Sequence, residues 1–250
     1  MATPPVVASG APEAPGPVNH LGRLIGVFFS PKATFEDIAR RPSWLVPVLL
    51  MTVLGIVTAF VMNQKVDWRD VASKKIEESP RTANMSAEQK EQQLAMSAKV
   101  SPYVAYFFGT LGPIIAVVVV AVVMLLAYNL IGGAGAKFGA AMGIVSHAMV
   151  VGLLGTLFLI LILYLKPPGT IDLENPVATN MGAFLPESTP KALMALAKSI
   201  DIFTLWTLLL ISIGFTVVNP KKLSGKALSI AIAVWAVYVA CKMGLAWIFS

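Results

Sequence analysis

The sequence predicts an all-α membrane protein: a bundle of five transmembrane helices preceded by amphipathic helices at the membrane interface. Composition is the first reason. The 250 residues are 56% hydrophobic and only 13% charged, with a mean hydropathy of +0.76, whereas a soluble domain carries about 25% charged residues. The second reason is that the apolar residues gather in long runs. A helix of about 20 residues, rising 1.5 Å per residue, spans a hydrocarbon core of roughly 30 Å.

The N-terminal region is expected to lie outside the hydrocarbon core. Residues 1–20 are rich in Pro, Ala and Gly without periodicity, which is typical of a disordered tail. Residues 21–43 mix apolar and charged side chains at helical spacing and are too short and too charged to span. We expect them to form helices lying in the membrane interface; the alternative is that these helices pack on the protein itself. The expected interfacial anchors are Phe28, Phe29, Phe35 and Trp44.

A membrane domain of five spans is expected over residues 44–250. The spans cover residues 44–64, 103–131, 138–165, 199–218 and 227–249. A polar connection, residues 65–102, joins the first two spans; in it, Ser86 followed by Gln89 predicts a helix that begins with a capping box. The mixed charges of this connection favour a solvated surface, with a partner-binding surface as the alternative. Five crossings place the two termini on opposite sides of the membrane.

Small and polar residues mark the third span and its surroundings. Gly135, Gly139 and Gly143 recur every fourth residue, a pattern that lets another helix approach closely. This face fits packing within the bundle or contact between two copies of the chain. His147, one turn later, and Asn129, near the end of the second span, are polar groups at membrane depth. A lone histidine there favours a hydrogen-bonded packing role over a metal ligand or proton relay.

The last two spans carry one acidic and one basic residue. The basic turn of residues 219–226 is short, so the two helices are expected to be antiparallel neighbours. Asp201 lies roughly 25 Å from the turn along one helix, and Lys242 roughly 24 Å along the other. Both charges therefore reach a similar depth, where an unpaired charge is costly. They either form an ion pair that closes the hairpin or snorkel separately to the interface.

Three stretches carry a resemblance to a known family. They are FFSPKATFEDIARRPSWLVPVLL (residues 28–50), GGAGAKFGAAMGIVSHAMVVGLLG (residues 132–155) and the closing hairpin from residue 199. In their order and spacing these stretches resemble the bacterial branch of the Yip1-domain family. The resemblance covers the whole chain except the N-terminal tail. The resemblance implies five spans with a cytoplasmic N-terminus, and therefore a multi-pass protein of the bacterial inner membrane. Eukaryotic members act in vesicle traffic through Rab GTPases; their Asp-Leu-Tyr-Gly-Pro type motif is absent here, so that role is not carried over.

The motifs of an enzyme are missing, and we expect neither catalysis nor a cofactor or metal. Ser146 and His147 are adjacent on a helix and so point about 100° apart, which argues against a nucleophile and its base. The stretch from Ser224 to Lys226 lacks the first Gly and the final Ser or Thr of a phosphate-binding loop. The net charge of +6 is spread over loops, which favours contact with anionic lipid and not with nucleic acid.

Two functions remain open. The first is a non-catalytic membrane protein that organises membrane lipid or partner proteins, as a scaffold or in a trafficking-like role; its partners would be lipid, other membrane proteins or a second copy. The alternative is a small-solute or ion transporter, or a permease subunit, that uses His147, Asp201 and Lys242, with Asn129 beside them. A water-filled cavity joining His147 to Asp201 would favour the transporter.

Overall fold

The computed structural model describes residues 18–79, 82, 84–167, 173, 176–186 and 188–248, so residues 1–17 of the expected tail lie outside it. The regular elements of the described residues are helices, which confirms the all-α class. They are α1 (His20–Phe29), α2 (Pro31–Arg40), α3 (Leu45–Lys65), α4 (Trp68–Glu78), α5 (Ala87–Leu130), α6 (Phe138–Met149), α7 (Gly152–Leu165), the 3-10 helix η2 (Met181–Phe184), α8 (Lys191–Ser199), α9 (Ile202–Val218), α10 (Pro220–Leu223) and α11 (Ala227–Ile248).

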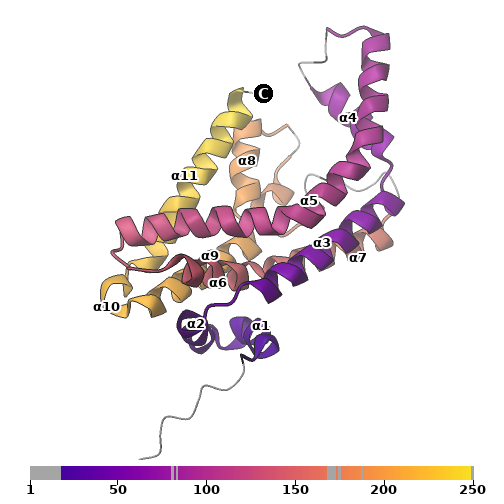
Figure 1. The fold of residues 1–250 in the computed structure, drawn as a ribbon. Helices are drawn as coiled ribbons and strands as arrows, with labels where there is room; N and C mark the ends of the chain where they lie inside the picture. The colour runs from indigo at the N-terminus through magenta and orange to yellow at the C-terminus, as the bar shows by residue number, and fades with distance from the viewer. Residues whose placement is uncertain are drawn as a thin grey trace, which may run out of the picture.

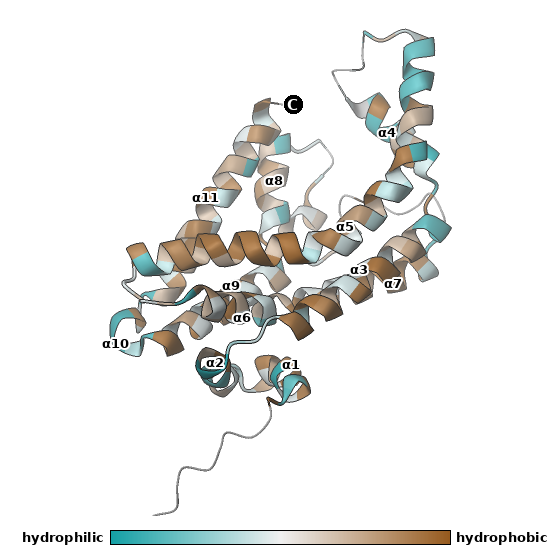
Figure 2. Ribbon diagram, in the orientation of Figure 1, coloured by the Kyte–Doolittle hydropathy of each residue, from teal (hydrophilic) through white to brown (hydrophobic). Residues whose placement is uncertain are grey.

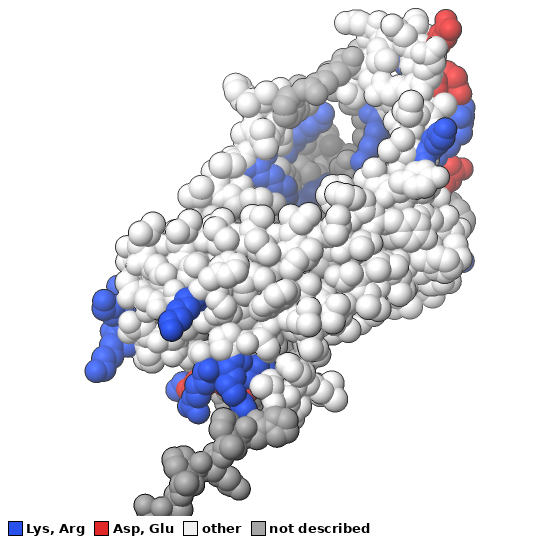
Figure 3. Space-filling view, in the orientation of Figure 1, with Lys and Arg blue, Asp and Glu red and all other residues white. Residues whose placement is uncertain are grey.

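The helices suited to crossing a membrane form the middle of the molecule. Among the described residues, four helical segments are long and apolar enough: α3, α5, α6 with α7, and α11. Helix α9 is apolar but has 17 residues, or about 25 Å. Apolar residues dominate this middle region (Figure 2), and its face over α3 and α5 shows neither basic nor acidic side chains (Figure 3). Helix α1 and the C-terminus lie at opposite ends of the molecule (Figure 1).

Helix α5 is far longer than the span expected within it. Its 44 residues extend about 66 Å, and they run through Pro102 and Pro113 without interruption. Each proline removes a single ladder hydrogen bond, which the long flanking helical segments tolerate. The expected capping box is present: the Ser86 hydroxyl accepts from Gln89 N–H at 3.2 Å, and the Gln89 side chain accepts from Ser86 N–H at 2.9 Å. Helix α4 and the polar N-terminal part of α5 project together from the bundle (Figure 1); residues 68–78 and 87–101 are called the arm below.

The fourth span is broken where the sequence predicts a continuous helix. Helix α8 ends at Ser199, and α9 begins at Ile202. Asp201 stands between them with extended backbone, and its carboxylate accepts hydrogen bonds from the N–H groups of Phe203 (2.9 Å) and Thr204 (3.0 Å). Aspartate is a preferred N-cap because its side chain satisfies N–H groups that have no partner within the helix. The break therefore arises from capping by Asp201.

The hydrophobic core lies where α2 meets α6 and α9. Phe35 and Ile38 of α2 are fully buried, as are Ile144 of α6 and Phe215 of α9. The ring of Tyr128 stacks on Phe215 with 4.1 Å between centroids. Helix α2 is thus part of the folded body and does not simply rest on a lipid surface.

This packing corrects part of the expected set of interfacial anchors. Phe35 is 0% exposed, and Phe28 is half-buried, with its ring edge-on to Trp206 at 5.6 Å between centroids. Phe29, by contrast, is 82% exposed, and Trp44 is 37% exposed. The alternative, packing on the protein itself, therefore describes both residues: Phe28 of α1 contacts Trp206 of α9, and Phe35 of α2 is buried where α2 meets α6 and α9. Interfacial anchoring by Phe29 and Trp44 stays a prediction.

A buried arginine ties the N-terminal helices together. Arg23 of α1 is 3% exposed. Its Nε donates to Asp37 Oδ2 at 2.7 Å, and its Nη1 donates to Arg41 O at 3.0 Å and to Ser43 Oγ at 2.6 Å. Because its partners lie on α2 and on the segment leading to α3, Arg23 fixes the angle at which the N-terminal helices meet the bundle.

The Asp37 carboxylate should make stability depend on pH. The Arg23 guanidinium, followed by that of Arg41, lowers the pKa of Asp37 from 3.8 to about 2. Because the pKa is lower in the folded state, the ionised group contributes its full stabilisation above a pH of about 4, and the contribution is lost as the pH falls to about 2. We expect Asp37→Asn to lower the Tm in detergent by a constant amount between pH 7 and 4. Below pH 4 the difference from wild type should shrink; a difference that vanished at pH 5 would contradict this.

Candidate functional site

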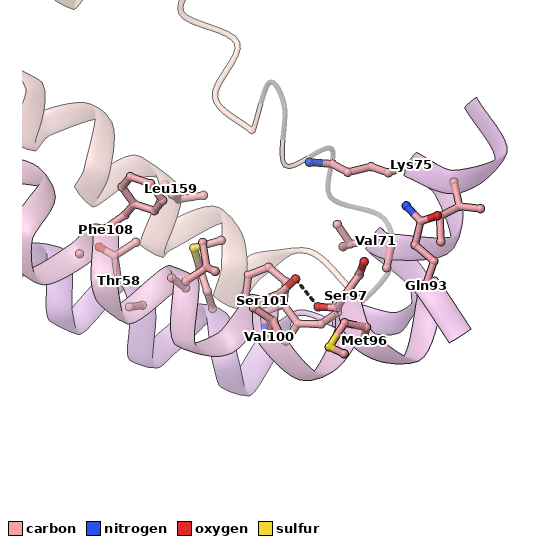
Figure 4. Close-up of a pocket in the computed structure, with 18 of the residues that line it drawn as sticks. Thr58, Val71, Lys75, Gln93, Met96, Ser97, Val100, Ser101, Phe108 and Leu159 are labelled. Atoms are coloured by element: carbon pink, nitrogen blue, oxygen red, sulfur yellow. Dashed lines mark hydrogen bonds between the residues drawn. The ribbon is translucent and has the colours of Figure 1, made fainter. Parts of the chain in front are cut away.

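A cavity of about 900 Å³ lies between α3, α4, α5 and α7. Its deep part is lined by small and apolar residues, and its outer part reaches the arm (Figure 4). The small and apolar lining residues include Gly55, Ala59, Ala105, Phe108, Gly109 and Leu159. Thr58 lies among them (Figure 4), and its hydroxyl donates to Leu54 O at 2.8 Å. A volume of this size lies within the usual range of about 300–1,000 Å³ for sites that bind small molecules.

The floor of the cavity is a glycine contact between α3 and α5. A Cβ atom added to Gly109 would stand 2.6 Å from Gly55 O, and one added to Gly55 would overlap the Gly109 backbone. Only hydrogen atoms on both Cα atoms let the two backbones come so close. The helices therefore touch at Gly55 and Gly109.

The outer part of the cavity is polar. Lys75 of α4 and Gln93 and Ser97 of α5 line it, and Figure 4 shows the Lys75 ammonium extended over the cavity. Among the described residues Lys75 has no ion pair, whereas the neighbouring Lys74 Nζ lies 3.0 Å from Asp70 Oδ2. The cavity thus combines an apolar interior with one positive charge at its mouth.

Hydrogen bonds hold the arm over the cavity. Arg69 of α4 pairs with Glu91 of α5 at 2.6 Å. At the base of the arm, Trp68 Nε1 donates to Asn63 Oδ1 at 2.8 Å, and Asn63 Nδ2 donates to Pro102 O at 3.4 Å. Asn63 therefore links the end of α3 to both helices of the arm, which keeps the mouth of the cavity in place.

The two charges of the closing hairpin have separate partners. Asp201 caps α9, and its Oδ2 accepts from Thr179 Oγ1 at 2.5 Å. Lys242 Nζ donates to Ser199 Oγ at 3.1 Å. Among the described residues the structure forms no direct ion pair between Asp201 and Lys242, because each is engaged elsewhere. The two do reach a similar level, since Ser199 stands two residues before Asp201.

The two expected polar residues of the second and third spans bond to backbone groups. His147 is fully buried, and its Nδ1 lies 2.8 Å from Gly143 O; since a carbonyl only accepts, Nδ1 carries the proton. Asn129 bonds twice to Ala136, donating to its carbonyl at 3.0 Å and accepting from its N–H at 2.8 Å. Asn129 thereby holds the turn between α5 and α6. Neither residue lines the cavity.

The expected glycine face is reduced to one close contact. A Cβ atom on Gly143 would stand 2.8 Å from Ile38 Cγ2, so this glycine admits α2. The nearest atom to such a Cβ on Gly139 is Pro42 Cβ at 3.8 Å, an ordinary contact. Gly135 lies before α6 in a turn with φ +67°, and a Cβ there would have no neighbour within 4 Å among the described residues. The pattern therefore does not form one continuous helix-packing face.

The Yip1 domain family model matches residues 25–247, nearly the whole chain. The chain belongs to the Yip1-domain family. Comparison with curated proteins and with solved structures finds no match. The family assignment, together with the long apolar helices, makes this Yip1-domain protein an integral, multi-pass membrane protein.

The Yip1 family is known as a family of non-enzymatic membrane proteins. Within the described part of the chain, no group of three or more His, Cys, Asp or Glu side chains could hold a metal ion. The cavity side chains offer apolar contact, hydroxyl and amide groups and one ammonium.

Sequence reasoning missed the cavity of this Yip1 domain, although a signal for its floor exists. Gly55 and Ala59 are four residues apart on α3, and Ala105 and Gly109 are four residues apart on α5. Both pairs are small-xxx-small patterns of the kind noted on the third span. The pattern does not identify the partner helix, and that information comes only from the fold.

Proposed function

We propose that this Yip1-domain protein is a non-catalytic membrane scaffold whose spans anchor it and whose arm binds partner proteins. The observation that carries the proposal is the arm itself. Helix α5 measures about 66 Å along its axis, roughly twice the thickness of the hydrocarbon core, and its residues 87–99 are mostly polar. The arm therefore presents a polar helical surface outside the hydrocarbon core, where a partner protein can reach it.

One face of the arm is open for such a partner. Glu88, Gln92, Ala95 and Lys99 are exposed and recur at helical spacing on one side of α5. None of them lines the cavity. Their mixed charge and polarity resemble the rim of a reversible protein interface.

We further propose that the chain crosses the membrane five times with its N-terminus in the cytoplasm of a bacterial cell. In this arrangement α9 is the additional crossing, with α8 completing its length. The positions of α1 and the C-terminus at opposite ends of the molecule support an odd number of crossings (Figure 1). The transporter has less support. Asn129, Asp201 and Lys242 bond locally, and neither they nor His147, whose Nε2 has no hydrogen-bond partner among the described residues, line the cavity.

Crosslinking and co-purification from native membranes test the scaffold. The double variant Gln92→Arg with Ala95→Arg places two bulky cations on the exposed face of the arm. We expect it to lose crosslinked partner protein about tenfold or more, as for hot-spot changes of about 1.4 kcal/mol or above, with the Tm unchanged within about 2 °C because both sites are exposed.

The matched control is Lys221→Glu, an exposed change in α10 at the far end of the bundle. It should recover the same partners as wild type. Recovery of the same partners by the arm variant, or of no partner by the wild type, would overturn the proposal.

A further inference from the structure

We infer that the cavity beneath the arm holds one acyl chain of an anionic glycerophospholipid, with the lipid phosphate at Lys75. This inference goes beyond the scaffold and does not depend on a protein partner. It is drawn from the depth of the cavity, from the apolar character of its interior and from the charge at its mouth.

The depth of the cavity matches one leaflet of a bilayer. Gly55, on its floor, is the central residue of the 21-residue helix α3, so the floor lies near the middle of the membrane. From Gly109, on the same floor, to Ser97 at the mouth is 12 residues of α5, or about 18 Å. One leaflet of the hydrocarbon core is about 15 Å, half of 30 Å. An extended acyl chain with its headgroup therefore reaches from the floor to the arm.

The apolar interior selects a hydrocarbon chain over water. Phe108, Val104 and Leu159 line this apolar part together with alanine and glycine. Phe108 is 63% exposed, so the apolar part is an open groove on the surface that faces the bilayer. The surrounding helices α3, α5 and α7 lie in the bilayer, where lipid chains are the most abundant apolar molecules, so a chain can enter from the adjacent leaflet.

The mouth selects a negative headgroup. The Lys75 ammonium extends over the cavity and has no ion pair among the described residues. Its stem leaves α4 beside Val71, which lines the same cavity. Gln93 and Ser97 line the same cavity and can donate hydrogen bonds to phosphate oxygens. Charge complementarity at this position fits a phosphate, and the absence of a described acidic group among the lining residues removes a competitor.

Native mass spectrometry of the purified full chain tests the inference. The probes are phosphatidylglycerol and phosphatidylcholine with identical acyl chains, added at equal concentrations in neutral detergent. We expect one tightly bound phosphatidylglycerol per chain, preferred over phosphatidylcholine by about fivefold, the contribution of one lysine near an anionic surface. Lys75→Gln should remove this preference, and Lys74→Gln, one residue away and paired with Asp70, should retain it.

Filling the cavity tests the chain-binding half of the inference. Ala105→Phe occupies the floor, and Val100→Trp occupies the wall nearer the mouth; the second variant serves if the first does not fold. Either should reduce binding of both lipids about tenfold. Equal binding of the two lipids by wild type, or unchanged binding in Lys75→Gln or in a folded cavity-filling variant, would overturn the inference. Partner recovery is measured on the same samples. Partner recovery reports on the scaffold and lipid binding reports on the lipid site, so failure of one proposal can be told from failure of the other.

Discussion

Phe35→Ser is expected to lower the free energy of unfolding by about 4 kcal/mol, whereas Phe29→Ser should leave it nearly unchanged. Phe35 is 0% exposed and lies in the core where α2 meets α6 and α9. Truncating a buried phenylalanine costs about 3–5 kcal/mol, and a buried serine hydroxyl adds to that cost. Phe29 is 82% exposed, so its truncation removes little packing. Thermal unfolding of the detergent-solubilised chain measures both effects.

Phe29 should instead affect how deeply the N-terminal helices insert into the membrane interface. If Phe29 enters the interface, Phe29→Ser should raise the accessibility of a cysteine placed nearby on α1 to a water-soluble reagent, with the Tm unchanged. Equal loss of Tm in the two variants would contradict the burial of Phe35 against α6 and α9.

Gly55→Leu is expected to destabilise the chain by about 3 kcal/mol, because it forces α3 away from α5. Even the first added carbon would overlap the Gly109 backbone, which cannot rotate away as a flexible side chain can. Overpacking of this kind costs about 1–3 kcal/mol and sometimes more. The reciprocal variant Gly109→Leu should behave alike, since its Cβ would stand 2.6 Å from Gly55 O. The Tm in detergent is the measurement.

Gly139→Ala provides the control for the glycine prediction. Its added Cβ would lie 3.8 Å from Pro42 Cβ, and alanine favours a helix over glycine by about 0.5–1 kcal/mol. The Tm should therefore stay constant or rise slightly. A large loss at Gly139 with none at Gly55 would restore the packing face expected from the glycine spacing and would refute the contact between α3 and α5.

Local features of the sequence predicted the class and the placement of most helices. Apolar length marked the spans because crossing a bilayer depends mainly on the number of consecutive apolar residues. The Ser86 and Gln89 capping box was predictable because both partners lie within three residues. The uninterrupted course of α5 through Pro102 was not predictable in this way, since a proline's effect depends on the stability of the helix around it.

The candidate site could be predicted only in fragments. Lys75 and Gln93 belong to the connection whose mixed charges indicated a solvated or partner-binding surface, and Gly55 lies in a predicted span. Nothing in the spacing of these residues places them around one cavity, because they come from three helices. The same limit applies to Asp201: the sequence predicted a continuous helix there, and the role of Asp201 as the N-cap of α9 appears only in the structure.

By itself the sequence determined that this chain is an all-α, multi-pass membrane protein of the Yip1-domain family, because hydropathy, length and the order of segments are properties of the chain alone. The tertiary structure alone decided that Phe35 is core while Phe29 is exposed, that Asp201 and Lys242 have different partners, and that α3 and α5 meet at Gly55 and Gly109. The physical reason is that apolar periodicity tells which side of a helix avoids water, whereas the choice between lipid and another helix as its neighbour depends on how whole helices pack together.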